Sequence, residues 1–233
     1  MARAGAWGAL VFGVLFSTAG LPPAALAAGL PVARQASLET ENASADARRL
    51  TAWVLATGDS QGLPFLVVDK VAARVFAFDG QGRLAGTAAA LLGAAAGDAL
   101  LPGEADRPLS RISTSERITP AGRFVATPGA NLAGKNILWI DYAAAISLHP
   151  VVVGVPAERR QQRLASPTAQ DNRISFGCIN VPAAFYDKVV LGLFASTVGI
   201  VYILPETRFL ETVFFTPAPT SLAAATALPA PGR

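Results

Sequence analysis

Residues 173–180 read Arg-Ile-Ser-Phe-Gly-Cys-Ile-Asn and contain Cys178, the only cysteine of the 233-residue chain. The only histidine, His149, closes an apolar run 29 residues upstream. A thiolate is a strong nucleophile, and a nearby imidazole can lower the thiol pKa or accept its proton. The sequence therefore predicts Cys178 as nucleophile and His149 as base. The alternative is structural: a small buried thiol and a hydrogen-bonded histidine at a strand end.

The N-terminus has the pattern of an export signal. Arg3 gives a positive start, an apolar core runs from Trp7 to Phe16, and Ala25-Leu26-Ala27 supplies small residues for cleavage. The apolar core is shorter than the ~20 residues that a membrane span needs. We therefore expect a signal peptide over residues 1–27, cleaved after Ala27, with an uncleaved anchor as the alternative. The protein is expected in the periplasm or cell envelope, with no stable membrane span after cleavage.

Charge and cysteine count restrict the partners. The net charge of +3 and the pI near 9.4 suit an anionic envelope polymer, and an exported protein rarely meets nucleic acid. One cysteine cannot form an internal disulfide, so a leftover thiol implies an intermolecular bridge or a reactive group. One His, one Cys and no clustered carboxylates predict neither a metal site nor a cofactor.

The hydrophobic pattern predicts a mainly β fold with short helices. Residues 28–62 form an N-terminal segment with one short helix, 63–205 a folded domain, and 206–233 a Pro- and Ala-rich disordered tail. Residues 91–109 are expected to be irregular, and the polar segment 158–173 to be a solvated loop or short helix rather than a rim for an anionic substrate. The expected strands are 65–69, 74–78, 83–87, 123–127, two within 136–148, 151–155 and 199–204, and the expected helices are 45–58 and 181–194.

Three landmarks between residues 65 and 204 resemble the L,D-transpeptidase catalytic domain, a bacterial family that cross-links peptidoglycan. The first is the strand-turn-strand of Phe65–Phe78. The second, Thr119-Pro-Ala-Gly-Arg-Phe124, is similar to the family's Thr-Pro-x-Gly-x-Phe turn. The third is a histidine closing a strand, then Ser175-Phe-Gly-Cys-Ile-Asn180, which is similar to the family's Ser-x-Gly-Cys motif followed by an apolar residue and Arg or Asn. The resemblance implies a β-sandwich-like catalytic domain.

The resemblance also implies roles for the motif. Cys178 would be the nucleophile, His149 its base, and the backbone N–H groups of Gly177 and Cys178 the oxyanion donors. Ser175 would shape the site. The substrate-binding side chains are expected to be Arg173, Phe176 and Asn180.

The implied reaction is acyl transfer on peptidoglycan stem tetrapeptides. Cys178 would attack the carbonyl of the third residue, D-Ala would leave, and a second stem's amine would form a 3→3 cross-link. β-Lactams of the carbapenem type would acylate the same thiol. With water as acceptor the site would be an L,D-carboxypeptidase, and with a lipoprotein lysine an anchoring enzyme. A different class of function is a non-catalytic peptidoglycan-binding module.

The chain departs from the family pattern at three points. Phe176 stands where the family often has His: facing the cleft it would contact the stem, and facing inward, the alternative that we favour, it would belong to the core. Pro150 follows His149, where a small or polar residue is usual. The spacing from His149 to Cys178 is longer than expected, because of the polar segment 158–173.

Overall fold

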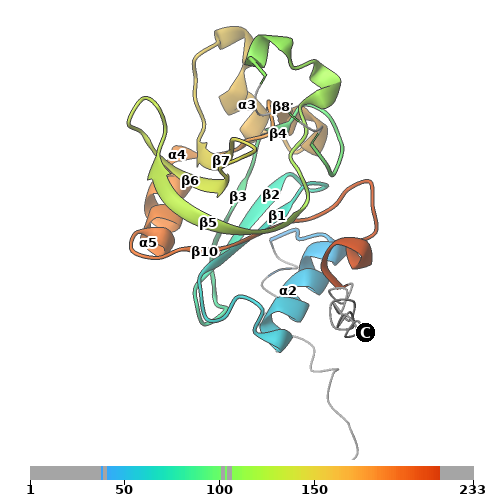
Figure 1. Cartoon of the computed structure of the whole chain (residues 1–233), viewed down its shortest axis with the longest axis vertical. Helices are drawn as coiled ribbons and strands as arrows, with labels where there is room; N and C mark the ends of the chain where they lie inside the picture. Colours follow the sequence, from blue (N-terminus) through green and yellow to red (C-terminus); the bar gives the residue numbers. More distant parts are fainter. Residues whose placement is uncertain (1–37, 39–40, 101–102, 104–106, 216–233) are drawn as a thin grey trace, which may run out of the picture.

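The computed structural model describes residues 38, 41–100, 103 and 107–215 (Figure 1). The predicted signal peptide and residues 216–233 of the predicted tail lie outside them. The strands are β1 (Phe65–Asp69), β2 (Arg74–Phe78), β3 (Leu84–Ala89), β4 (Leu92–Gly93), β5 (Gly122–Ala130), β6 (Asn136–Asp141), β7 (Ile146–Pro150), β8 (Arg173–Ser175), β9 (Ile179–Val181) and β10 (Gly199–Ile203). The helices are α2 (Ala45–Thr57), η2 (Leu109–Arg111), η3 (Thr114–Glu116), η4 (Pro156–Glu158), α3 (Arg160–Leu164), η5 (Ala169–Asn172), α4 (Ala183–Phe185), η6 (Tyr186–Val190), α5 (Leu191–Phe194) and η7 (Glu211–Phe215).

Eight of these strands form one sheet in the order β3-β2-β1-β10-β5-β6-β7-β9, and β4 pairs with β8 in a second, small sheet. In the large sheet, neighbours are antiparallel except at two places, where β10 runs parallel to β1 and β9 runs parallel to β7. In the small sheet, β4 and β8 are parallel. The long β5 curves across the molecule and joins the two halves of the large sheet (Figure 1). The prediction of a mainly β fold with short helices is confirmed.

The sandwich-like layering comes from a single bent sheet whose two halves bury one core. Leu66 on β1, Leu138 on β6 and Leu148 on β7 belong to the same buried cluster. Helical residues Tyr186 and Phe194 pack into it. Because this apolar core is shared, the β7–β9 edge is held in place by the same packing that stabilises the rest of the domain.

The opposite face of β1 is covered by α2. Strand β1 is buried on both faces, and its Phe65 and Val67 pack in a second cluster with Leu50 and Val54 of the helix. The helix ends at Thr57 and is capped by Gly58, which adopts the left-handed conformation (φ 67°) and donates its N–H to the Val54 carbonyl. The predicted helix over residues 45–58 is thus confirmed to within one residue.

A buried charge cluster ties the C-terminal segment to the sheet. Lys70 Nζ lies 2.8 Å from Asp98 Oδ1 and 3.4 Å from Glu206 Oε1. Asp98 also accepts hydrogen bonds from the backbone N–H groups of Glu206 and Thr207, at 2.8 and 2.9 Å. Phe214 is buried against α2 and the sheet. The core therefore extends past residue 205, and the prediction of a tail from residue 206 is wrong for residues 206–215.

This cluster makes stability depend on pH. Burial acts to raise the pKa of Asp98, but hydrogen bonds from Lys70 and Thr207 outweigh it and hold that pKa well below its ordinary value. A carboxyl with a depressed folded-state pKa stabilises the fold above its unfolded pKa, near 4. Its contribution is therefore complete at neutral pH and is lost as the pH falls below about 4.

The structure departs from the predicted elements in places. Residues 151–155 do not form a strand: only the Val151 N–H continues the ladder, to Val181 O at 2.8 Å, and Val152 and Val153 are exposed. The segment 91–109 contains the two-residue strand β4, which was not expected. The polar segment 158–173 includes the short helix α3, as the interpretation of a solvated loop or short helix had it. Its Arg160 also lines a cleft, as the alternative interpretation of a rim had it. Within the described residues, no helix has the length and hydropathy needed to cross a membrane.

Replacing Lys70 with Met should destabilise the protein by roughly 3–5 kcal/mol, because it leaves the buried Asp98 carboxylate without its nearest cation. Urea unfolding at pH 7 measures this. Lys188→Met is the matched control, since Lys188 is exposed, and it should change the free energy of unfolding by less than about 0.5 kcal/mol. Equal stabilities for the two variants would show that the cluster contributes nothing.

Candidate functional site

The pairing of β7 with β9 brings the candidate residues together. The two strands are parallel neighbours, with His149 opposite Asn180. Side chains alternate along a strand, so Leu148 points into the core while its neighbours Ser147 and His149 lie on the opposite face of the strand. Ser147 and His149 therefore share a face with Cys178 and Asn180. Ser147 Oγ lies 3.5 Å from Cys178 Sγ, and Asn180 Nδ2 lies 3.3 Å from His149 Nε2.

The loop before Cys178 is held in a tight turn. Ser175 Oγ donates to the Cys178 carbonyl at 2.6 Å and accepts the Gly177 N–H at 3.1 Å. Gly177 has φ +132°, and a Cβ there would lie 2.7 Å from the Ile118 carbonyl oxygen. Only glycine fits this close approach. Because the Gly177 N–H is bonded to Ser175, its predicted role as an oxyanion donor is wrong for this structure, which leaves the N–H of Cys178 as the candidate.

Thr119, the first residue of the predicted turn motif, holds the loop before Cys178 in place through hydrogen bonds. Its side chain is fully buried. Its hydroxyl accepts the Gly93 N–H at 2.9 Å and donates to the Gly177 carbonyl at 2.8 Å. Its own carbonyl accepts from Lys70 Nζ at 2.9 Å. One threonine thus connects the buried charge cluster, the β4 segment and the loop that carries Cys178.

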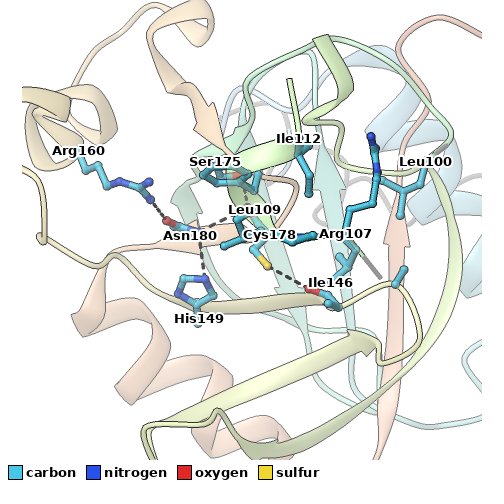
Figure 2. Close-up of a pocket in the computed structure, with 14 residues that line it drawn as sticks. Leu100, Arg107, Leu109, Ile112, Ile146, His149, Arg160, Ser175, Cys178 and Asn180 are labelled. Atoms are coloured by element: carbon cyan, nitrogen blue, oxygen red, sulfur yellow. Dashed lines mark hydrogen bonds between the residues drawn. The ribbon is translucent and has the colours of Figure 1, made fainter. Parts of the chain in front are cut away.

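The tautomer of His149 follows from its neighbours. Nδ1 lies 2.8 Å from the Pro150 carbonyl oxygen, which can only accept a hydrogen bond, so Nδ1 carries a proton. Nε2 is then the position that gains or loses a proton, and it faces Asn180. Asn180 Oδ1 in turn accepts from Arg160 Nη1 at 2.7 Å. Figure 2 shows Arg160, Asn180 and His149 as a continuous chain beside Cys178.

Electrostatics couple the thiol and the imidazole. Burial acts to raise the pKa of Cys178, but hydrogen bonds with His149 and Ser147 outweigh it and hold that pKa below its ordinary value. Burial acts to lower the pKa of His149, but hydrogen bonds with Cys178 and with the Pro150 carbonyl outweigh it and raise that pKa. Both shifts favour transfer of the thiol proton to the imidazole, which is what an activated cysteine nucleophile requires.

Cys178 opens into a cleft of about 560 Å³. The cleft walls are largely apolar, and two guanidinium groups line it, those of Arg107 and Arg160. In Figure 2 they lie to either side of Cys178. The lining residues are Leu100, Arg107, Pro108, Leu109, Ile112, Ala144, Ala145, Ile146, His149, Arg160, Ser175, Phe176, Cys178 and Asn180. No carboxylate is among these described residues, so the cleft favours an anionic ligand.

Both cleft arginines have acidic partners outside the cleft wall. Arg107 Nη1 lies 2.9 Å from Glu116 Oε1. Hydrogen bonds from Ser113 and Arg107 lower the pKa of Glu116 to about 2, so this carboxylate stays ionised at neutral pH. Arg160 Nε lies 2.5 Å from Glu158 Oε2. These pairs orient the two guanidinium groups without placing an acid at Cys178.

His149 also borders a second hollow, of about 420 Å³. Its lining includes Lys135, Tyr186 and Asp187. The imidazole therefore separates the cleft that contains Cys178 from a neighbouring hollow that does not.

The two remaining predicted site residues, Phe176 and Arg173, lie in different surroundings. Phe176 lines the cleft and lies against Arg117, whose guanidinium carbon is 3.8 Å from the ring centre, so the expectation of a core phenylalanine is wrong. Arg173 does not line the cleft: it pairs with Glu206 and donates to the Lys70 carbonyl at 3.0 Å. Its predicted contact with substrate is therefore replaced by a structural one.

Sequence reasoning missed two residues that the site uses. Ser147 could have been found, because it precedes His149 by two positions on a strand and so shares its face. Arg160 could not, because its contact with Asn180 spans 20 residues of a polar segment that has no strong pattern. Among the described residues, no group of three or more His, Cys, Asp or Glu could hold a metal ion.

The chain was compared with family models, curated proteins and solved structures. No family model matches the chain, and no curated protein matches its sequence. Among solved structures, the chain is similar to the NMR structure of the catalytic domain from E. faecium L,D-transpeptidase. The two are 18% identical, the alignment covers 60% of this chain and 95% of that one, and the TM-score is 0.29.

Replacing His149 with Gln should raise the pKa of Cys178 toward the ordinary thiol value near 8.5, because the imidazole hydrogen bond is lost. The pH midpoint of iodoacetamide alkylation should therefore lie higher in the variant than in the wild type. Mass spectrometry reads the reaction without ambiguity, since the chain has one cysteine. An unchanged midpoint would show that the two side chains are not coupled.

Replacing Thr119 with Val should destabilise the protein by about 1–3 kcal/mol for each of the two backbone groups left unpaired, those of Gly93 and Gly177. Thr119→Ser keeps the hydroxyl and should recover most of the loss. Urea unfolding measures stability, and the alkylation rate of Cys178 reports whether its loop has moved. A valine variant as stable as the serine variant would rule out the bridging role.

Proposed function

We propose that the protein is an exported L,D-transpeptidase that acts on peptidoglycan stem tetrapeptides and forms 3→3 cross-links. The observation that carries this proposal is the grouping of His149, Cys178 and Asn180 on one face of two parallel strands, at the edge of a cleft. The lowered pKa of Cys178 supports a nucleophilic thiol. The peptidoglycan substrate follows from the resemblance of the Ser175–Asn180 and Thr119–Phe124 motifs to those of that family.

In the first half-reaction the Cys178 sulfur attacks the carbonyl carbon of the third stem residue. The thiol proton passes to His149 Nε2, and the oxyanion of the tetrahedral intermediate is bound by the Cys178 backbone N–H. When the intermediate collapses, the carbon–nitrogen bond to D-Ala breaks and His149 returns the proton to the leaving amine. The product is a thioester on Cys178 and free D-Ala.

In the second half-reaction an amine of another stem attacks the thioester. His149 Nε2 accepts the proton of the attacking amine, the carbon–sulfur bond breaks, and the thiol is restored. The Nδ1–H bond to the Pro150 carbonyl keeps Nε2 directed at the reacting atoms through both steps. Pro150, a departure from the family pattern, therefore supplies a carbonyl that orients the base.

The cleft's charge supports a stem peptide as donor. Such peptides carry free carboxylates, and the cleft presents Arg107 and Arg160 with apolar walls between them. Water as acceptor would make the protein an L,D-carboxypeptidase, and a lipoprotein lysine would make it an anchoring enzyme. A binding module without catalysis would use the same cleft but would need no activated thiol, and the Cys178–His149 coupling argues against it.

Incubating the protein with a disaccharide tetrapeptide that contains diaminopimelate should release D-Ala and yield a 3→3 linked dimer, identified by mass spectrometry. Cys178→Ala should give neither product, because it lacks the nucleophile. His149→Ala should slow acylation by roughly 10²–10⁴-fold. A carbapenem should add its mass to the wild type at Cys178 and not to Cys178→Ala.

The other outcomes separate the candidate functions. Release of D-Ala with tripeptide as the only product identifies a carboxypeptidase. Dimer formed by folded Cys178→Ala would refute the mechanism. Tight binding of the tetrapeptide with no thioester and no carbapenem adduct identifies a binding module.

A further inference from the structure

We propose that Arg160 is a positioning residue: by holding the side-chain carbonyl of Asn180, it directs the Asn180 amide N–H at His149 and favours the neutral thiol–imidazole pair over the thiolate–imidazolium pair. The proposal rests on the role proposed above for Cys178 and His149. Its test measures protonation instead of turnover, so the two can fail separately.

The orientation of Asn180 is fixed by hydrogen-bond chemistry. A guanidinium has only donors, so the Asn180 atom 2.7 Å from Arg160 Nη1 must be the oxygen. The amide nitrogen then lies 3.3 Å from His149 Nε2 and 3.5 Å from the Cys178 carbonyl oxygen. Asn180 is 1% exposed, so water cannot easily replace Arg160 as its partner.

Arg160 is itself held in place. It opens the short helix α3, and its Nε lies 2.5 Å from Glu158 Oε2. Its side chain is 15% exposed. The polar segment 158–173, which lengthens the spacing between His149 and Cys178, therefore places the Arg160 guanidinium against Asn180.

This orientation has opposite effects on the two forms of His149. Nδ1–H is used on the Pro150 carbonyl, so only Nε2 can change its protonation. When Nε2 is unprotonated, its lone pair accepts the Asn180 N–H. When Nε2 is protonated, two donors face each other, which disfavours the imidazolium. Rotation of the amide would turn Oδ1 toward Nε2 and remove this penalty, but the bond to Arg160 prevents it.

The charge of Arg160 acts in the same direction: together with burial it lowers the pKa of His149, against the larger opposing effects of Cys178 and the Pro150 carbonyl. Other titratable groups border His149 from the second hollow: Lys135 on the loop between β5 and β6, and Tyr186 and Asp187 on η6. These groups stay the same when Arg160 is changed, so a comparison of Arg160 variants isolates its contribution.

The consequence concerns the free protein. Arg160 lowers the fraction of Cys178 present as thiolate before a substrate binds. The thiolate is the form that oxidants attack, so this also slows oxidation of the lone thiol. Proton transfer to His149 would then occur mainly as the thiol attacks a bound acyl carbonyl.

The chain allows a direct test, because it has one histidine and one cysteine. Arg160→Gln should raise the pKa of His149, followed by NMR of ¹⁵N-labelled histidine. It should lower the pH midpoint of Cys178 alkylation. We expect each shift to be about 0.5–1 pH unit, roughly three- to tenfold in the ionisation constant. Arg159→Gln removes the same charge from the adjacent, exposed residue and should shift neither value.

Two further variants separate orientation from charge and cover a failure to fold. Arg160→Lys keeps the charge and one donor and should lie between wild type and Arg160→Gln. In an Asn180→Ala background, Arg160→Gln should shift the pKa of His149 less than it does in the wild type, because only the charge effect remains. Unchanged or opposite shifts in Arg160→Gln and Arg160→Lys would overturn the proposal. Cross-linking by a wild type whose variants show no shift would leave the function standing and remove this inference.

Discussion

The parallel pairing of β7 with β9 is the constraint on which the site depends. Parallel neighbours in register place residue opposite residue, and the period of two puts every second side chain on the same face. His149 is thereby fixed beside Asn180, and Ser147 beside Cys178. The intervening Leu148 and Ile179 are buried in the main core. A shift of one residue in the register would turn Ser147 and His149 toward the core and expose Leu148. Burial of Leu148 therefore stabilises the register that the site needs.

A second layer of contacts connects this edge to the rest of the domain. Thr119 bonds to the loop of Cys178 through its hydroxyl and to Lys70 through its carbonyl. Lys70 is a fully buried cation, paired with Asp98 and Glu206. Buried ion pairs are often no more stabilising than apolar packing of the same volume. The buried ammonium of Lys70 instead fixes three separate segments of the chain relative to Cys178.

Two opposing electrostatic effects act on the protonation of the Cys178–His149 pair. The interaction of Cys178 with His149 lowers the thiol pKa and favours the ion pair, whereas the Asn180 amide, oriented by Arg160, favours the neutral form. The same arginine contributes to a cleft whose described walls carry cations and no acids. Arg160 thus links proton transfer to the charge that a ligand would meet.

The sequence by itself determined the elements with strong local patterns and singled out Cys178 and His149 as the candidate reactive pair. Short apolar and β-branched runs located β1, β2, β6, β7 and β10, and the lone cysteine and histidine were the candidates for nucleophile and base. The conformation and the contacts of the short or polar segments depend on the tertiary structure alone. The valines at 151–155 have high strand propensity but no neighbouring strand to pair with, whereas the three-residue β8 and β9 form because β4 and β7 lie beside them. Arg173 and Arg160 carry the same charge in the same polar surroundings, yet one joins the buried cluster at Glu206 and the other reaches Asn180. Their contacts differ because the position of a long charged side chain depends on the partners that the fold brings near it. Those partners are distant in sequence.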